Sequence, residues 1–144
     1  MIKSKLRRKI LKIRKQNYNK KLKIDLSVVN SFINIKNFKF KSLGGYYPCN
    51  YEIDDMEILN FFEKKKIKIS FPIIKKKNQM DFFEYSTKLP FEINKYGILE
   101  PISSKKIYPD ILLIPLVAFD KNLNRLGYGG GFYDRYFERI EKIK

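Results

Sequence analysis

The chain has 144 residues, the size of a single domain, and its 31 basic and 15 acidic residues give a formal net charge of +16. It contains no histidine, which excludes Ser-His and Cys-His nucleophiles and the usual zinc sites, so any chemistry must rest on carboxylates, Lys, Arg, Tyr and a hard cation such as Mg²⁺. The single cysteine excludes an internal disulfide, and we find neither an apolar run long enough to span a membrane nor the h-region of a secretory signal. We therefore expect a cytoplasmic protein with no membrane partner.

The excess of positive charge admits two interpretations. A basic nucleic-acid-binding module would use a Lys- and Arg-rich first helix, with exposed Tyr and Phe side chains as stacking platforms for bases. Against it, no nucleic-acid-binding motif is visible, and the basic residues are spread along the chain in a composition that an AT-rich genome tends to produce. We favour compositional drift and expect no nucleic-acid partner, while noting that a positive field attracts anionic ligands.

Two helices are predicted near the N-terminus. Residues 3–21 have the pattern of a basic amphipathic helix, which on its own would be a solvated surface element, and residues 22–35 have the pattern of a second helix. Asp25 or Ser27 is the expected N-cap of the second helix. The apolar positions are Leu6, Ile10 and Ile13 in the first helix, and Leu22, Leu26, Val29 and Ile33 in the second.

The middle of the chain alternates between strand and helix patterns. A strand is expected from Phe38 to Tyr47, a helix from Asp54 to Lys65, and a strand from Ile67 to Phe71 that ends at Pro72. A further strand is expected from Met80 to Tyr85. Strand, helix and strand in this order predict a βαβ unit and a parallel sheet.

The stretch from Asp110 to Arg135 is the most informative one in the sequence. An apolar run from Ile111 to Phe119 predicts a strand, and after a polar turn comes a loop with four of the chain's seven glycines. These are Gly127, Gly129, Gly130 and Gly131, and a helical pattern follows them. A glycine loop between a strand and a helix N-terminus presents backbone N–H groups and the positive end of the helix dipole to an anion such as a phosphate.

The loop is an ambiguous signal when it is considered alone. It matches neither G-x-x-x-x-G-K-[ST] nor G-x-G-x-x-G, so a flexible connection or a tight entry into the helix remains an alternative to a phosphate site. Arg125 and Arg135 flank the loop, and Asp134 is a first-turn carboxylate that could either cap the helix or hold a metal ion. These neighbouring charges favour the anion site.

The order of the elements predicts the fold class. We expect a single α/β domain over residues 1–144, with three α/β/α layers and a central, mostly parallel sheet of the Rossmann-like kind. The glycine loop is expected at the C-terminal end of a strand, where ligands bind in such sheets.

Several segments closely resemble one enzyme family, the 5-formyltetrahydrofolate cyclo-ligases, also called methenyltetrahydrofolate synthetases. The longest likeness runs from Arg125 to Arg135 (RLGYGGGFYDR) and is preceded by Pro115 to Asp120 (PLVAFD). Lys3 to Arg7 fits the family's K-x-x-L-R pattern, and Tyr96 to Pro101 (YGILEP) is similar to its G-I-x-E-P element. Tyr46 to Ile53 is similar to a family block in which an aromatic-x-P segment precedes a glutamate.

The resemblance implies roles for individual residues. ATP would be held by cations and backbone N–H groups of Lys3, Ser4, Lys5, Leu6, Arg7, Arg125, Leu126, Gly127, Tyr128, Gly129, Gly130, Gly131, Phe132 and Tyr133. The folate substrate would be bound by Tyr47, Glu52, Tyr128, Gly129, Gly130, Gly131 and Phe132. Arg125 and Arg135 are the candidate catalytic residues, and Asp134 would bind Mg²⁺. Without the resemblance, the simpler interpretation of Glu52 is a carboxylate that favours the N-terminus of the next helix.

The implied activity is the ATP- and Mg²⁺-dependent cyclisation of 5-formyltetrahydrofolate to 5,10-methenyltetrahydrofolate, with release of ADP and phosphate. In the family, the formyl oxygen is thought to attack the γ-phosphate, after which N10 attacks the activated carbon and phosphate departs. Such an enzyme mainly aligns the reacting atoms and neutralises charge, which requires no histidine. ATP and the folate are the expected partners, and we expect a monomer.

Members of the family continue beyond the point where this sequence ends. Their continuation adds strands to the sheet and an acidic residue that joins metal binding. We therefore expect a cyclo-ligase-like domain that is C-terminally incomplete. Two alternatives to an active enzyme stay open: an inactive homologue that only binds nucleotide or folate, and the basic nucleic-acid-binding module described above.

Overall fold

The computed structural model describes residues 2–19, 23–85 and 90–143. The helices are α1 (Lys3–Asn17), α2 (Leu26–Ile35), α3 (Met56–Lys64) and α4 (Phe132–Glu141), with a 3-10 helix η1 (Lys76–Asn78). The strands are β1 (Ser42–Gly44), β2 (Lys68–Ile74), β3 (Met80–Glu84), β4 (Phe91–Ile93), β5 (Leu99–Pro101), β6 (Lys106–Ile107), β7 (Ile111–Leu112), β8 (Ala118–Phe119) and β9 (Arg125–Leu126). None of the helices in these described segments is long and apolar enough to cross a membrane.

The central sheet has five strands in the order β6-β3-β2-β1-β7. Strand β1 pairs in parallel with both β2 and β7, whereas β3 runs antiparallel to both β2 and β6. Only β3 is therefore reversed relative to the others. The α/β prediction is confirmed, with a sheet that is mostly but not entirely parallel.

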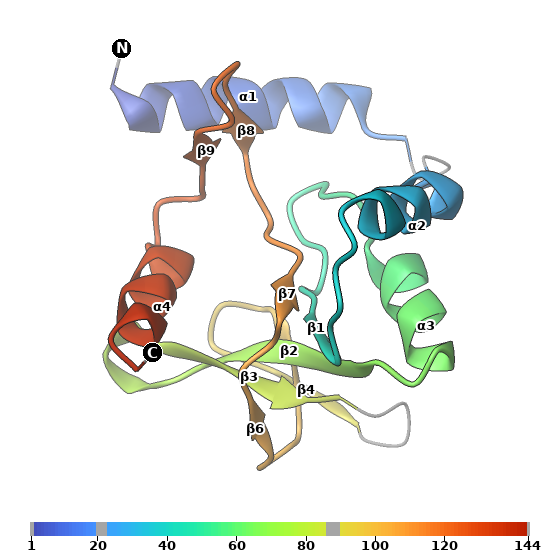
Figure 1. Cartoon of the computed structure of the whole chain (residues 1–144). Helices are drawn as coiled ribbons and strands as arrows, with labels where there is room; N and C mark the ends of the chain where they lie inside the picture. Colours follow the sequence, from blue (N-terminus) through green and yellow to red (C-terminus); the bar gives the residue numbers. More distant parts are fainter. Residues whose placement is uncertain (1, 20–22, 86–89, 144) are drawn as a thin grey trace.

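Helices cover both faces of the sheet, which gives the three predicted layers. Figure 1 shows α2 and α3 on one side and α4 on the other, while α1 lies apart from the sheet and crosses the β8–β9 ribbon. The ribbon is a separate two-stranded sheet, as is β4 with β5. Helices α2, α3 and α4 therefore pack around the central sheet, whereas α1 lies beside the separate β8–β9 ribbon.

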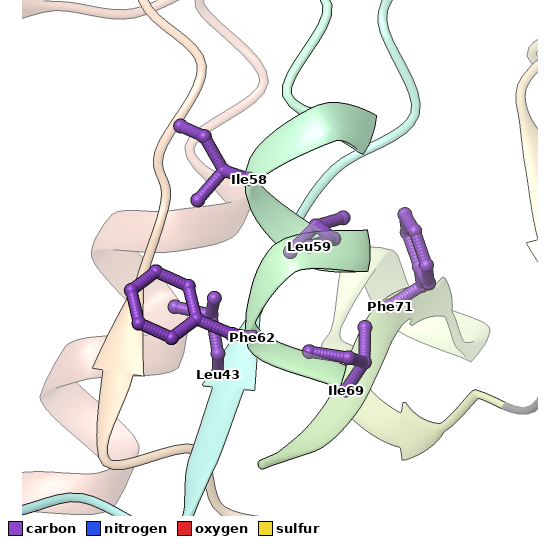
Figure 2. Close-up of a cluster of buried hydrophobic side chains, with 6 residues drawn as sticks. All are labelled: Leu43, Ile58, Leu59, Phe62, Ile69 and Phe71. Atoms are coloured by element: carbon purple, nitrogen blue, oxygen red, sulfur yellow. The ribbon is translucent and has the colours of Figure 1, made fainter. Parts of the chain in front are cut away.

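The predicted βαβ unit is formed by β1, α3 and β2, and it builds the main core. Helix α3 begins where the Asp54 carboxylate accepts a hydrogen bond from the Met56 N–H, at 2.9 Å. Its apolar positions then repeat at helical spacing and face Leu43 of β1 and the alternate residues Ile69 and Phe71 of β2 (Figure 2). The buried side chains of this core are Leu43, Ile58, Leu59, Phe62, Ile69 and Phe71.

A second core forms between α4 and the other face of the sheet. Met80 and Phe82 of β3 pack against Tyr136 of α4, and all three are buried. Arg139 fixes the same helix, because its guanidinium donates to the Met80 carbonyl at 2.6 Å and pairs with the Asp81 carboxylate. This second core places the start of α4, and hence the end of the glycine loop, beside the sheet.

Several predicted boundaries differ from the observed ones. Helix α1 ends at Asn17, because the backbone of Tyr18 is extended, whereas the helix was predicted to continue to residue 21. Residues 20–22 lie outside the described residues. Helix α2 begins at Leu26, because Asp25 caps it by accepting from the Ser27 N–H. Strand β1 is shorter than predicted, since beyond Gly45 the chain turns away and the Tyr46 N–H donates to Asp55 instead of to a strand.

The other two differences involve prolines. Pro72 does not end β2: the pairing of β2 with β1 stops at Ser70, so the missing N–H of Pro72 lies where β2 has only β3 as an in-register neighbour. The apolar run from Ile111 to Phe119 is not one strand. It forms β7 and β8 at its two ends, and the segment between them, which contains Pro115, leaves the sheet edge and reaches α1.

Candidate functional site

The glycine loop, residues 127–131, runs from β9 beside α1 to the start of α4 (Figure 1). Two of its glycines have positive φ, 102° at Gly129 and 65° at Gly131, and Gly131 is the N-cap of α4. Residues with a Cβ rarely adopt these conformations, which explains the glycines. The loop leads into a helix N-terminus as predicted, but it starts from the β8–β9 ribbon and not from a strand of the central sheet.

Helix α1 brings the N-terminal segment to this loop. The Arg7 Nε donates to the Gly127 carbonyl at 2.7 Å, across 120 positions of sequence. The guanidinium carbon of Arg7 also lies 3.4 Å from the position that a Cβ on Gly129 would take. Leu6 is half-buried on the same side of the helix, whereas Lys3, Ser4 and Lys5 are exposed. The two segments that resemble the family's ATP-binding elements therefore lie side by side.

The charged residues that flank the loop are paired with each other or with the backbone. Arg125 forms an ion pair with Asp134, with 2.6 Å between Nη2 and Oδ1, and its guanidinium lies 5.6 Å from the centre of the Tyr133 ring. Arg135 donates to the carbonyl of Gly130 at 2.6 Å and to that of Asn78 at 3.0 Å. Arg125 thus faces the side chains at the helix start, while Arg135 holds the glycine loop against η1.

A cavity of about 570 Å³ lies between the second half of α1, the loop after β1 and the segment between β7 and β8. It is lined by Arg14, Asn17, Tyr18, Asn19, Tyr46, Tyr51, Glu52, Ile53, Asp54, Ile114, Pro115 and Leu116. Glu52 is 7% exposed, and its Oε2 accepts from the Cys49 N–H at 2.7 Å. The other oxygen, Oε1, is buried and has no hydrogen-bond partner among the described residues. A buried carboxylate oxygen that lines a cavity can accept hydrogen bonds from a ligand that carries N–H groups.

Tyr128 connects the glycine loop to this cavity. Its hydroxyl accepts a hydrogen bond from Arg14, which lines the cavity, at 2.8 Å. Burial, and after it the Glu52 carboxylate within hydrogen-bonding reach of the phenol, raise the pKa of Tyr128 above its usual range, so it stays protonated. Tyr47, by contrast, does not line the cavity: its ring packs against Phe91, with 6.1 Å between the ring centres. Of the two predicted folate residues in this block, Glu52 is the one in the cavity.

A family model, described as the 5-formyltetrahydrofolate cyclo-ligase family, matches residues 1–144. The chain belongs to this family. A cyclo-ligase of Haemophilus influenzae is 35% identical over 102 residues, which cover 66% of this chain and 54% of the relative. A cyclo-ligase of Mycoplasma genitalium is 33% identical over 103 residues, which cover 71% of this chain and 54% of the relative. The chain spans about half the length of these relatives.

Solved structures of the family have the same fold. The 5,10-methenyltetrahydrofolate synthetase of Aquifex aeolicus is 26% identical, with a TM-score of 0.73 over 96% of this chain and 73% of that one. The fold also matches a synthetase of Mycoplasma pneumoniae, at 24% identity and a TM-score of 0.64, over 96% of this chain and 78% of that one. The resemblance on which the predictions rest is thereby confirmed.

Prediction from the sequence missed three residues that line the cavity. Arg14, Tyr18 and Tyr51 all line the cavity, and the two tyrosine rings contact each other edge to face, with centres 5.3 Å apart. A signal for Arg14 was present, because it lies seven positions after Arg7 and residues at this spacing share a helix face. No local pattern in the sequence connects Tyr18 with Tyr51.

Asp55 is a further buried carboxylate at the end of the cavity loop, and it makes stability depend on pH. Asp55 is 2% exposed and accepts a hydrogen bond from the Tyr46 N–H at 3.1 Å, while its Oδ1 has no partner among the described residues. Burial raises the pKa of Asp55 from 3.8 to about 7. Between pH 3.8 and about pH 7, Asp55 is protonated in the folded protein but ionised in the unfolded chain. The free energy of unfolding therefore falls as the pH rises through this range, and the full loss of stability is reached above about pH 7.

Replacing Asp55 by asparagine is expected to raise Tm above pH 7 by at least about 5 °C and to change it little near pH 4. The asparagine carbonyl can still accept from the Tyr46 N–H, so the variant removes the charge and keeps this contact. Thermal melts of both proteins between about pH 4 and about pH 8 measure the effect. A difference in Tm that stays constant across this range would contradict the buried-charge explanation.

Proposed function

We propose that this protein is a 5-formyltetrahydrofolate cyclo-ligase that uses ATP and Mg²⁺. The observation that carries the proposal is the contact between α1 and the glycine loop beside the cavity that contains Glu52. Arg7 bonds Gly127 at 2.7 Å, and Tyr128 in the same loop bonds Arg14 on the cavity wall at 2.8 Å. A phosphate site and a folate site would therefore share one wall, which the transfer of a phosphoryl group between the two substrates requires.

ATP would bind between the N-terminal half of α1 and the glycine loop. The exposed Lys3 and Lys5 would face the phosphates, since they are cations with no competing partner among the described residues. The N–H groups around Gly129 and Gly131, together with the start of α4, would supply backbone donors. Arg125 would turn from Asp134 to the γ-phosphate as charge develops there.

The folate would bind with its pterin ring in the cavity. Glu52 offers a buried carboxylate oxygen that lacks a donor, and a pterin carries an amino group beside a ring N–H that together match the two oxygens of a carboxylate. Tyr18 and Tyr51 form an aromatic edge where the flat part of the substrate would stack. Tyr128 would lie between the folate and the phosphates.

In the proposed reaction the formyl oxygen on N5 attacks the γ-phosphorus, and ADP leaves. N10 then attacks the activated formyl carbon and loses its proton, and the carbon–oxygen bond breaks as phosphate departs with the formyl oxygen. The residues of this chain would contribute by holding the oxygen, phosphorus and N10 in line and by screening the negative charge with Arg125 and Lys3. Arg135 would act by keeping the loop in shape, because its observed hydrogen bonds go to backbone carbonyls.

Asp134 fits a single-carboxylate Mg²⁺ site. Mg²⁺ in nucleotide enzymes is commonly bound by one or two carboxylates together with phosphate oxygens, and Asp134 is exposed at the start of α4 beside the glycine loop. The described residues contain no group of three or more acidic or cysteine side chains that could hold a metal without such a ligand. When bound with ATP, the ion would neutralise phosphate charge.

An absorbance assay with 5-formyltetrahydrofolate, ATP and Mg²⁺ tests the proposal by following the methenyl product. Product that depends on both ATP and the folate is the expected result. A folded protein that binds ATP without turnover would instead be the binding-only homologue, and a protein that binds neither substrate would contradict the assignment. Size-exclusion chromatography of the same sample tests the expectation of a monomer.

The nucleic-acid alternative is disfavoured by where two arginines of α1 point. Arg7 and Arg14 donate to the protein's own backbone carbonyls, so they are not available as phosphate contacts along an exposed strand. Single-strand binding that weakens steeply with salt would nevertheless identify such a module.

Replacing Gly129 by alanine is expected to weaken ATP binding about tenfold, because a φ of 102° strains any residue with a Cβ and the loop would have to change its conformation beside Arg7. Gly97→Ala is the matched control: Gly97 also has positive φ, 75°, but a Cβ there would meet nothing within 4 Å. Both variants should lose similar stability, and calorimetric titration with ATP should separate them. Equal ATP affinity in the two variants would contradict a phosphate role for the loop.

A further inference from the structure

Arg14 of α1 makes three long-range side-chain hydrogen bonds. Its Nη2 donates to the carbonyls of Leu116 and Val117, both at 2.7 Å, and its Nη1 donates to the Tyr128 hydroxyl at 2.8 Å. These partners lie more than a hundred positions along the chain, in the segment between β7 and β8 and in the glycine loop. One guanidinium therefore joins three parts of the protein.

These hydrogen bonds matter because α1 contributes no buried side chain that would fix its position by packing. None of the side chains between Lys3 and Asn17 is buried. Its half-buried stripe includes Arg7 and Arg14, two turns apart, and each of them bonds to the signature region. Arg7 fixes the half of α1 that faces the glycine loop, and Arg14 fixes the half that lines the cavity.

We infer that Arg14 is a positioning residue of the folate cavity: its guanidinium holds α1, the Leu116 carbonyl and Tyr128 in one arrangement and so sets the distance between two cavity walls. This inference rests on the proposed function. Arg14 and Leu116 both line the cavity and belong to different segments, and the hydrogen bond between them joins these two parts of the wall. The bond to Tyr128 orients the phenol that lies next to Glu52.

The chemistry of the side chain supports this role. A guanidinium is planar, stays charged and offers donors in a fixed fork, so it can satisfy two adjacent carbonyls and a hydroxyl at once. A lysine ammonium in the same place is a point donor on a flexible stem and cannot reproduce the fork. Removing the group would leave the Leu116 and Val117 carbonyls without this donor and would free the second half of α1 to move away.

Kinetics with both substrates can test the role. Arg14→Gln is expected to raise KM for 5-formyltetrahydrofolate about tenfold while KM for ATP stays within about threefold, since the Arg7 anchor of the ATP half is untouched. Arg14→Lys should raise KM for 5-formyltetrahydrofolate by a smaller factor than Arg14→Gln does. Arg8→Gln is the control, because Arg8 is exposed on the same helix and the change removes the same charge. Tyr128→Phe should raise KM for 5-formyltetrahydrofolate less in the Arg14→Gln variant than in the unmodified protein, because the hydrogen bond between the two side chains is already absent from that variant.

Trypsin cleavage of α1 adds a readout that needs no turnover. Arg14→Gln should expose the lysines of α1 to faster cleavage than Arg8→Gln does, and folate affinity measured by tyrosine fluorescence should fall with it. Equal effects of the two variants, or equal rises in both KM values for Arg14→Gln, would overturn the inference and leave Arg14 as a general anchor of the fold. Absence of folate binding by the unmodified protein would contradict the proposed function itself, and the inference about the folate cavity with it.

Discussion

Replacing Glu52 by glutamine is expected to raise KM for 5-formyltetrahydrofolate about a hundredfold and to leave KM for ATP within about threefold. The carboxylate is buried, and its Oε2 is fixed by the Cys49 N–H, so its position does not depend on the ligand. Its Oε1 has no donor among the described residues. Glutamine would keep the contact to Cys49 but would present an amide N–H where the substrate also presents N–H groups, so one attraction would become a repulsion.

The size of this effect follows from the environment of Glu52. A hydrogen bond to a buried charged group is worth about 1.5–3 kcal/mol, more than a neutral one, and about 2.7 kcal/mol corresponds to a hundredfold change in affinity. The variant should fold, because it relieves a buried negative charge. Glu57→Gln is the matched control: Glu57 lies on the exposed side of α3, where it pairs with Lys23 at 3.1 Å. Steady-state kinetics in which both variants behave alike would remove Glu52 from the folate site.

The parts of the fold that were predictable are those specified by local patterns. The β1–α3–β2 unit was recognisable because the apolar periodicity changes from strand to helix and back between Phe38 and Phe71, with Asp54 marking the helix start. The helix after the glycine loop was recognisable for the same reason. In both cases the prediction depends only on residues that are close together in the sequence.

The parts that were not predictable depend on contacts between distant residues. The run from Ile111 to Phe119 is apolar enough for one strand, yet β1 offers register partners only to Ile111 and Leu112, and Arg14 draws the later carbonyls to α1. Burial of these residues on two different surfaces leaves the same apolar pattern as burial in one sheet. The cavity is hidden for a similar reason, because its walls come from three segments that only the tertiary structure brings together.

The family resemblance proposed roles for residues that the local sequence patterns could not distinguish. Without the resemblance, the simpler interpretation of Glu52 was a carboxylate at the start of α3, but the hydrogen bond at that helix start comes from Asp54, and Glu52 lines the cavity. Tyr47 belongs to the same segment, but its ring packs on Phe91 outside the cavity, so its predicted folate contact stays a prediction. The roles of individual residues therefore have to be tested one by one.

Replacing Asp134 by asparagine is expected to lower Mg²⁺-dependent turnover at least about a hundredfold while changing Tm by no more than about 3 °C. Its side chain is 68% exposed, and its partner is Arg125, so the pair contributes little to stability. Asparagine would still offer an oxygen to Arg125, but it would lack the negative charge that a hard cation requires. The Mg²⁺ concentration for half-maximal activity should rise as well, which separates loss of a metal ligand from loss of a helix-start carboxylate.

Glu138→Gln provides the control for this prediction, because Glu138 is an exposed carboxylate one turn further along α4 and the change removes the same charge from the same helix. Turnover as a function of Mg²⁺ concentration, measured beside thermal melts, should show an effect for Asp134→Asn only. If Asp134→Asn lost stability and activity in parallel, the carboxylate would serve the helix dipole and the Arg125 pair, and ATP would have to bring its metal to a different group. If turnover fell without any change in the Mg²⁺ dependence, Asp134 would act through Arg125, whose guanidinium it holds 2.6 Å away at the entrance to the glycine loop.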